Sequence, residues 1–115
     1  MQRGEIRLVD LEPAGDGEAN KLRPAVIVSN DGANATASWL GRGVVTVVPV
    51  TTNIRNIYPF QVLLLATETG LREDSKAQAE QVRSVAVQRV GTRIGIVTTT
   101  VMNDLDNALR LHFAL

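Results

Sequence analysis

Two uninterrupted runs of β-branched residues constrain the fold of this 115-residue chain more than any other feature. Residues 25–29 read AVIVS, and residues 44–50 read VVTVVPV. Short apolar runs without polar alternation are typical of strands that are covered on both faces. The two runs therefore predict central strands that form the core of a β-rich fold.

Shorter patterns predict further elements around this core. In residues 4–11 the alternation predicts a strand with Ile6 and Leu8 inward and Arg7 outward. The polar residues 12–22 predict a loop, because Pro and Gly interrupt the pattern there.

The segments after the central runs give signals of unequal strength. Residues 30–43 (NDGANATASWLGRG) predict a loop with room for one helical turn but for no long element. Residues 60–66 and 93–97 each predict a strand. Residues 77–85 are ambiguous, because helix-forming Ala, Gln and Glu are combined with Val at a mixed spacing.

The last segment has the clearest helical pattern in the chain. Residues 98–100 are threonines, which can cap a helix N-terminus. Asp104 and Asp106 lie toward the start of the segment and Arg110 lies toward its end, as the helix dipole favours. We expect the helix to pack across one end of a barrel through residues at helical spacing: Val101, Leu105, Ala108, Leu109 and His112.

The composition bounds the class of protein. A hydrophobic content of 44% over 115 residues supports a single domain, residues 1–115. The absence of cysteine excludes disulfides, thiolate metal sites and a cysteine nucleophile. The sequence has no signal-peptide pattern and no apolar run long enough to cross a bilayer. We therefore expect a cytoplasmic protein without a membrane segment.

The charged and aromatic residues give a mixed signal for nucleic acid. Twelve Lys and Arg residues balance twelve Asp and Glu residues, so the whole chain has no basic excess. Apart from Lys21 and Lys76, however, the basic residues are arginines, whose planar fork suits phosphate. The few aromatic residues could stack at most one or two bases.

Most catalytic constellations have no support in the sequence. His112 is the single histidine, and its place on the helical face favours a partly buried or interface position over catalysis. Ser-His-Asp and Cys-His catalysis are therefore unsupported. The adjacent Glu73 and Asp74 are typical of a solvated turn, and we expect neither a metal nor a cofactor.

Polar residues stand at the ends of the two predicted central strands. Arg23 precedes Pro24 and the first run, while Thr51, Thr52 and Asn53 follow the second run. If the strands are neighbours, Arg23 and Thr51 face one phosphate, where the cation would stabilise a pentavalent phosphorane and the hydroxyl would fix an oxygen. An ordinary surface arginine and a common turn are the alternative interpretation.

Four sequence blocks in this order resemble a known family. They read RGEIRLVDLEP, KLRPAVIVSND, VVPVTTN and EQVRSV and extend over nearly the whole chain. Each block is weak alone, but the combination is similar to the MazF/PemK/Kid family of type II toxin-antitoxin systems. The resemblance implies a mainly β fold with a C-terminal α-helix, namely the SH3-like β-barrel of MazF, PemK and CcdB toxins. The resemblance also implies that residues 77–85 form a strand.

The same resemblance implies an activity and partners. It implies a sequence-selective, metal-independent endoribonuclease toxin that cuts single-stranded RNA, including mRNA, and so inhibits translation and growth. Attack of the RNA 2′-OH on the adjacent phosphate would yield 2′,3′-cyclic phosphate and 5′-OH ends. The implied partners are a second copy, in a homodimer whose interface contributes to the RNA groove, and a cognate MazE-like antitoxin with which the toxin forms a DNA-binding complex. An acidic antitoxin tail would occupy the groove in place of RNA.

The family's site residues fall on specific positions of this chain. The essential arginine falls on Arg23 and the essential threonine on Thr51, with Thr52 as a possible alternative. The general base stays unassigned, with Glu18 as one candidate. Tyr58 would stack a flipped base, although a half-buried barrel tyrosine is an equal interpretation. The resemblance implies further substrate-binding positions at Glu18, Glu80 and Gln81, while Asn53 and Tyr58 are RNA-binding candidates from their own residue types and their place after the second run.

Two other functions stay open at this point. A gyrase-binding toxin of the CcdB kind shares the implied fold and dimer but has no RNA chemistry, and the RP and VTT blocks argue against it. A family member that has lost cleavage would act as an antitoxin-binding decoy, which the intact Arg23 and Thr51 disfavour. The RNA sequence that is recognised depends on loop shapes and cannot be predicted.

Overall fold

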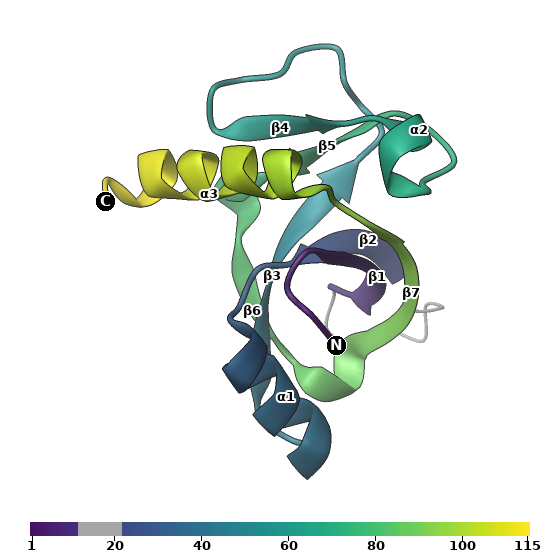
Figure 1. Ribbon diagram of the computed structural model, residues 1–115, viewed down its shortest axis with the longest axis vertical. Helices are drawn as coiled ribbons and strands as arrows, with labels where there is room; N and C mark the ends of the chain where they lie inside the picture. The colour runs from purple at the N-terminus through teal and green to yellow at the C-terminus, as the bar shows by residue number, and fades with distance from the viewer. Residues whose placement is uncertain (12–21) are drawn as a thin grey trace, which may run out of the picture.

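The computed structural model describes residues 1–11 and 22–115, which form a curved antiparallel sheet with three helices (Figure 1). Neighbouring strands follow the order β4-β5-β3-β2-β1-β7, and β6 also pairs with β3. The expected fold, mainly β with a C-terminal helix, is therefore confirmed. The strands are β1 (Glu5–Asp10), β2 (Leu22–Ile27), β3 (Val44–Thr51), β4 (Gln61–Leu64), β5 (Ser75–Gln78), β6 (Arg83–Ala86) and β7 (Val90–Ile96).

The helices lie at three places around the sheet. In Figure 1, α1 (Asp31–Leu40) projects from the end of the sheet where β3 begins, and α2 (Ala66–Thr69) follows β4. The C-terminal α3 (Thr99–Phe113) lies along β4. No helix in the described part of the chain is both long and apolar enough to cross a membrane. Two short 3-10 turns, η1 (Ala79–Gln81) and η2 (Val87–Arg89), complete the structure.

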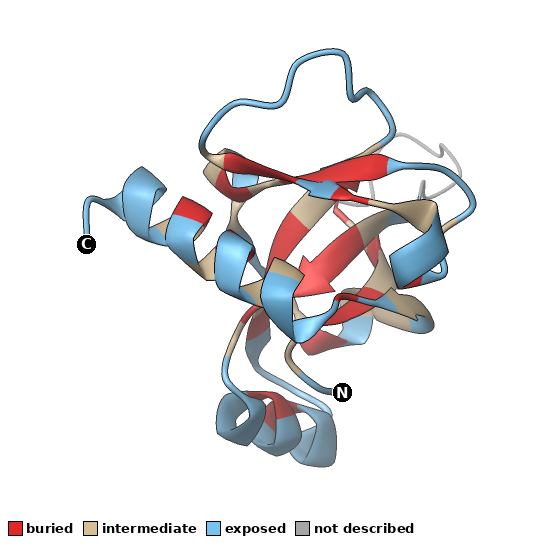
Figure 2. Ribbon diagram, turned by 45° about the horizontal axis from the view of Figure 1, so that its top comes forward, coloured by how far each residue is buried: buried red, intermediate tan, exposed pale blue. Residues whose placement is uncertain are grey.

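The two β-branched runs form central strands that are covered on both faces, as the sequence predicts. β2 and β3 pair with each other and are flanked by β1 on one side and by β5 and β6 on the other. Alternate residues enter two hydrophobic clusters, so that Val26 and Val48 belong to one cluster while Ile27 and Val47 belong to the other. Figure 2 shows this buried layer at the centre of the molecule. The central strands therefore provide a rigid base for any group at their ends.

The C-terminal helix has the predicted boundaries and the predicted packing face. The Thr98 side chain caps it by accepting a hydrogen bond from the Val101 N–H. Leu105 and Ala108 are buried in the cluster that also contains residues of β4 and β5. His112 is exposed, so the partly buried alternative is wrong for this chain, while the alternative of an interface position stays a prediction.

The prediction of a loop over residues 30–43 is wrong, because α1 has 10 residues. The Asn30 side chain caps its N-terminus by accepting from the Ala33 N–H at 2.8 Å. Gly41 ends the helix with a φ of 66°, in the left-handed region that glycine favours. Inside the helix, the fully buried Asn34 donates from Nδ2 to the Ser29 carbonyl oxygen at 2.8 Å. These caps and one buried polar contact outweigh the weak helix propensity of the segment.

Residues 77–85 form neither a helix nor one continuous strand, so the expectation of a single strand is wrong. The end of β5 pairs with the end of β3, since Ala77 lies opposite Val50. β6 then pairs with the first half of β3, where Arg83 lies opposite Val47. The η1 turn lies between β5 and β6 and allows these two short strands to pair, one after the other, with the single long strand β3.

Leu8 also departs from the prediction, because it is only partly buried. The pairing of β1 with β7 is irregular between Ile6 and Arg7 and again between Arg7 and Val9. Such irregularities interrupt the strict alternation of inward and outward residues. As a result Val9 is fully buried, whereas Leu8 lines a surface pocket.

Candidate active site

The antiparallel pairing of β2 with β3 places Arg23 and Thr51 together. Ala25 lies opposite Pro49 and Ile27 lies opposite Val47. Arg23 comes two residues before Ala25 and Thr51 comes two residues after Pro49, so both stand just past the end of this pairing. A guanidinium and a hydroxyl therefore lie at the same end of the two central strands.

Arg23 and Thr51 line a common pocket of about 380 Å³. The backbone around it is stiff, because Pro24 and Pro49 restrict the two strands where they meet. None of the described residues that line this pocket is a histidine or a carboxylate. The full lining consists of Arg23, Pro24, Pro49, Val50, Thr51, Thr52, Ser75 and Gln78.

The polar groups of this pocket have hydrogen-bonding capacity to spare. Arg23 is exposed and has no ion-pair partner within residues 1–11 and 22–115. Thr51 is half-buried, and its Oγ1 accepts a hydrogen bond from the Asn53 N–H at 3.2 Å. The hydroxyl proton of Thr51 is therefore free to be donated to a ligand. The pocket presents a cation and a hydroxyl donor, which together suit an oxyanion of a phosphate.

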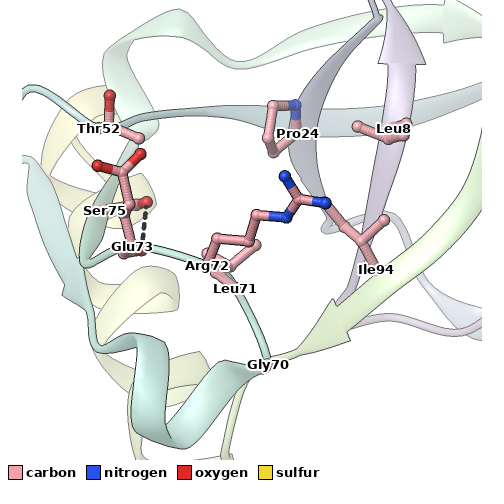
Figure 3. Close-up of a pocket in the computed structure, with 9 residues that line it drawn as sticks. All are labelled: Leu8, Pro24, Thr52, Gly70, Leu71, Arg72, Glu73, Ser75 and Ile94. Carbon is pink, nitrogen blue, oxygen red and sulfur yellow. Dashed lines mark hydrogen bonds between the residues drawn. The ribbon is translucent and has the colours of Figure 1, made fainter.

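A second pocket of about 470 Å³ adjoins the first one (Figure 3). Pro24, Thr52 and Ser75 line both pockets and so form a shared wall. The remaining residues of the second pocket are Leu8, Gly70, Leu71, Arg72, Glu73 and Ile94. We refer to the first cavity as the polar pocket and to the second as the apolar pocket.

The remaining predicted site residues that the structure describes are not brought into these pockets. Asn53 is exposed in the turn after Thr51, and its Oδ1 accepts a hydrogen bond from the Arg55 N–H at 3.3 Å. Glu80 is half-buried, and its Oε2 accepts from Gln61 Nε2 at 2.7 Å. Its Oε1 is buried without a hydrogen-bond partner among the described residues. Gln81 is exposed in η1, and Glu18 lies outside the described residues.

Tyr58 is half exposed and stacks on another aromatic side chain. Its ring lies 5.5 Å from the Phe60 ring, centroid to centroid, and the two planes are almost parallel. The Lys76 ammonium lies 5.9 Å from the centroid of the same Tyr58 ring. Phe60 thus already occupies one stacking surface of Tyr58.

Lys76 was not singled out by the sequence but fixes the segment that follows Thr51. The residue is buried, and its Nζ donates to the Asn56 carbonyl oxygen at 2.6 Å. In the sheet, Lys76 lies opposite Thr51. A lysine in a short SKAQ segment gives no sequence signal for this role, because the contact depends on a distant loop.

Glu5, the first residue of β1, is buried beside two arginines of β1 and β7. Its Oε1 accepts from Arg7 Nε at 2.9 Å and lies 2.9 Å from Arg7 Nη2, while Arg93 Nη1 lies 3.9 Å from its Oε2. Burial alone would raise the pKa of Glu5. The hydrogen bond and charge of Arg7, together with a backbone hydrogen bond at Gln2, outweigh burial and hold this pKa below its ordinary value of 4.5.

Within the described residues, no three His, Cys, Asp or Glu side chains are grouped so that they could hold a metal ion. Among the described residues, the charged and hydroxyl side chains that line the two pockets are Arg23, Arg72, Glu73, Thr51, Thr52 and Ser75.

Comparisons with known proteins identify relatives over the full chain. A sequence model of the family described as "PemK-like, MazF-like toxin of type II toxin-antitoxin system" matches residues 2–113. Endoribonuclease MazF9 of Mycobacterium tuberculosis is 63% identical over 115 residues, which are 100% of this chain and 98% of that protein. Endoribonuclease EndoA of Bacillus subtilis is 28% identical over 116 residues, with 100% of this chain and 96% of the relative covered.

Solved structures show the same fold. An endoribonuclease in complex with its cognate antitoxin, from a mycobacterial species, superposes with a TM-score of 0.78 at 25% identity and covers 100% of this chain and 96% of that one. A MazE-MazF structure from Deinococcus radiodurans gives a TM-score of 0.76 at 20% identity, with coverages of 100% and 96%. The two TM-scores show that these proteins share the overall fold of this chain.

Proposed function

This chain belongs to the PemK-like, MazF-like toxin family of type II toxin-antitoxin systems, and we propose that it cleaves single-stranded RNA at the polar pocket. Two full-length relatives are named endoribonucleases, which supports RNA cleavage. They do not support a gyrase-binding toxin of the CcdB kind. The observation that supports the proposed site is that Arg23 and Thr51 line one pocket at the same end of the paired strands β2 and β3.

In the proposed reaction the scissile phosphate lies between Arg23 and Thr51. The ribose 2′-OH forms a bond to phosphorus while the bond from phosphorus to the 5′-oxygen breaks. The products are a 2′,3′-cyclic phosphate and a 5′-OH end. Arg23 stabilises the negative charge of the pentavalent transition state, and the Thr51 hydroxyl donates to one of its oxygens. The transesterification is balanced because one proton leaves the 2′-OH and one proton reaches the 5′-oxygen. This proposed reaction does not require a metal.

Proton transfer needs a base that the described part of the polar pocket does not supply, since an arginine stays protonated. We propose Glu18, which precedes β2 in the sequence, for this role. Thr52 lies beside Thr51 on the shared wall and would contact the substrate there. Neither assignment alters the roles of Arg23 and Thr51.

The other proposed contacts lie around the pocket. Asn53, Tyr58, Glu80 and Gln81 are proposed to contact RNA away from the scissile phosphate. A cognate antitoxin with an acidic tail is proposed to cover the groove. Structural relatives have been solved with their antitoxins, which supports such a partner for this chain. We further propose that the single domain of residues 1–115 acts as a cytoplasmic homodimer.

The proposed activity is tested by incubating the protein with a long single-stranded RNA in EDTA and mapping cut positions and end chemistry. The Arg23→Ala variant is the test variant. The Arg83→Ala variant is the matched control, because Arg83 is an exposed arginine on β6 that lines neither pocket. We expect recurrent cuts with cyclic-phosphate ends for the wild type and the control, but not for the test variant. Intact RNA with a folded wild-type protein contradicts the proposal.

A further inference from the structure

The apolar pocket beside the polar pocket has no role in the chemistry described above. We infer that it binds the base of a nucleotide next to the scissile phosphate and so selects the sequence at one position. This inference rests on the proposed RNA cleavage, because a base can be placed there only if the phosphate occupies the polar pocket. The shared wall of Pro24, Thr52 and Ser75 makes the two pockets continuous.

The walls of this pocket suit the flat faces of a base. Leu8 from β1, Pro24 from β2 and Ile94 from β7 line one side of it, and Leu71 lies across from them (Figure 3). Its volume of about 470 Å³ lies within the range of small-molecule sites, which is roughly 300–1,000 Å³. An unstacked base has apolar faces that such walls cover, and its polar edges then point to the rim.

Two charged side chains of opposite sign stand at the rim. Figure 3 shows the Arg72 guanidinium directed toward Leu8, Pro24 and Ile94, and the Glu73 carboxylate turned toward Thr52. Within the described part of the chain, neither side chain has a hydrogen-bond or ion-pair partner. Arginine donates to base acceptors and offers a planar surface for stacking, while glutamate accepts from an exocyclic amine. The rim can therefore read a donor and an acceptor on one base edge.

The charge balance of each pocket indicates which part of the nucleotide it holds. The polar pocket has Arg23 and no carboxylate among its described lining residues, so it suits the phosphate anion. The apolar pocket pairs one cationic side chain with one anionic side chain. A second phosphate would meet the Glu73 carboxylate there, whereas a neutral base has no such repulsion.

The segment that carries Arg72 and Glu73 is held in place before any ligand binds. The Asp74 carboxylate accepts from the Ala66 N–H at 2.8 Å, which closes the segment on α2. The Ser75 hydroxyl donates to the Glu73 carbonyl oxygen at 3.0 Å. On β7, a Cβ at Gly95 would lie 2.3 Å from the Thr69 carbonyl oxygen, so α2 packs directly on the strand backbone. A preformed site of this kind loses little entropy when it binds a base.

The test combines base removal with removal of the rim charges. Short RNAs that contain one mapped cut sequence are prepared with an abasic ribonucleotide at each position around the cut in turn. Cleavage rates are measured for the wild type, for an Arg72→Ala/Glu73→Gln double variant, and for Glu68→Gln as a control on α2 outside both pockets. Arg72 and Glu73 are exposed, so their replacement leaves the core unchanged, and thermal unfolding verifies this.

We expect one abasic position to slow the wild type and the Glu68→Gln control by about tenfold. The double variant should cleave the intact RNA about tenfold more slowly and lose nothing further at that abasic position, because the base and the rim residues then act as a unit. If the double variant and the abasic substitution slow cleavage by independent factors at every position, so that the two losses in rate multiply, the base site is overturned while RNA cleavage stands. An unchanged sequence preference of the double variant also overturns it. Absence of any cleavage by the wild type overturns the proposed function and this site with it.

Discussion

The two pockets share a wall but are built from different parts of the fold. The polar pocket stands mainly on β2 and β3, which are the central strands and are buried on both faces. The apolar pocket draws on β1, on β7 at the end of the sheet order, and on the segment after α2. A central position fixes the groups that would perform the chemistry, whereas peripheral segments can vary without disturbing the core. The division predicts that cleavage and sequence selection are separable by mutation.

The largest effect is expected at Arg23, because it is the cation of the polar pocket. The Arg23→Ala variant should lose about 10³-fold in cleavage rate at every cut site, since one transition-state contact is removed. Arg23→Lys should recover about tenfold of that loss, because lysine keeps the charge but lacks the planar fork. Single-turnover rates on several cut sequences measure both effects. A loss confined to some sequences would contradict the division between the pockets.

The next effect is expected at Thr51. Thr51→Ala removes the proposed phosphate donor and the acceptor of the Asn53 N–H, and cleavage should fall by about 100-fold at all sites. Thr51→Ser keeps the hydroxyl, so its rate should stay within about threefold of the wild type if the hydroxyl donates one ordinary hydrogen bond. The same single-turnover assay compares the two variants. Equal rates for alanine and serine would show that the hydroxyl has no part in the reaction.

The polar pocket could be anticipated from the sequence, while the apolar pocket could not. Two buried runs with polar residues at their ends predict neighbouring strands, and antiparallel pairing then brings Arg23 and Thr51 to the same end of the strand pair. The apolar pocket joins Leu8, Leu71 and Ile94 from three distant segments. Leu8 reaches it because the β1–β7 pairing is irregular, and a single strand pattern does not reveal an irregularity in its pairing partner.

The helices α3 and α1 also differ in how far the sequence predicts them. The caps of α3 are accompanied by an apolar face of helical period, so its position was predicted correctly. The caps of α1 are equally present at Asn30 and Gly41, but Gly, Asn, Thr and Ser between them weaken the propensity signal. The contact of Asn34 with Ser29 has no periodic pattern, and it depends on a tertiary contact in which the Ser29 hydroxyl oxygen accepts from the Thr46 N–H of β3 at 3.0 Å.

A smaller effect is expected at Thr52, which lies on the wall between the pockets. Thr52→Val keeps the shape of the side chain but removes its hydroxyl, so cleavage should fall by about fivefold, as for one lost hydrogen bond. Because both pockets include this residue, the loss should differ among cut sequences. Thr52→Ser serves as the control and should retain the wild-type pattern. A uniform loss would assign Thr52 to the polar pocket alone.

The smallest effect on cleavage is expected at Glu5, which braces the β1–β7 side of the apolar pocket through Arg7 and Arg93. Glu5→Gln should destabilise the protein by about 1–2 kcal/mol at neutral pH, since a charge-assisted hydrogen bond is lost. The cleavage rate constant should change by less than about twofold, because no Glu5 atom lies in the polar pocket. A twofold change in rate corresponds to less free energy than about one hydrogen bond.

The pH dependence distinguishes a lost ion pair from a general packing defect. The pKa of Glu5 lies below 4.5 in the folded protein, so its ionised form is stabilised by folding. This contribution is present above the unfolded-state pKa and disappears as the pH falls through the folded-state pKa. Denaturant unfolding should therefore show a stability difference between wild type and Glu5→Gln that is full at neutral pH and shrinks below pH 4.5. A difference that persists unchanged in acid would mean that Glu5 stabilises β1 and β7 by packing rather than by its charge, and the apolar pocket would then be held by shape alone.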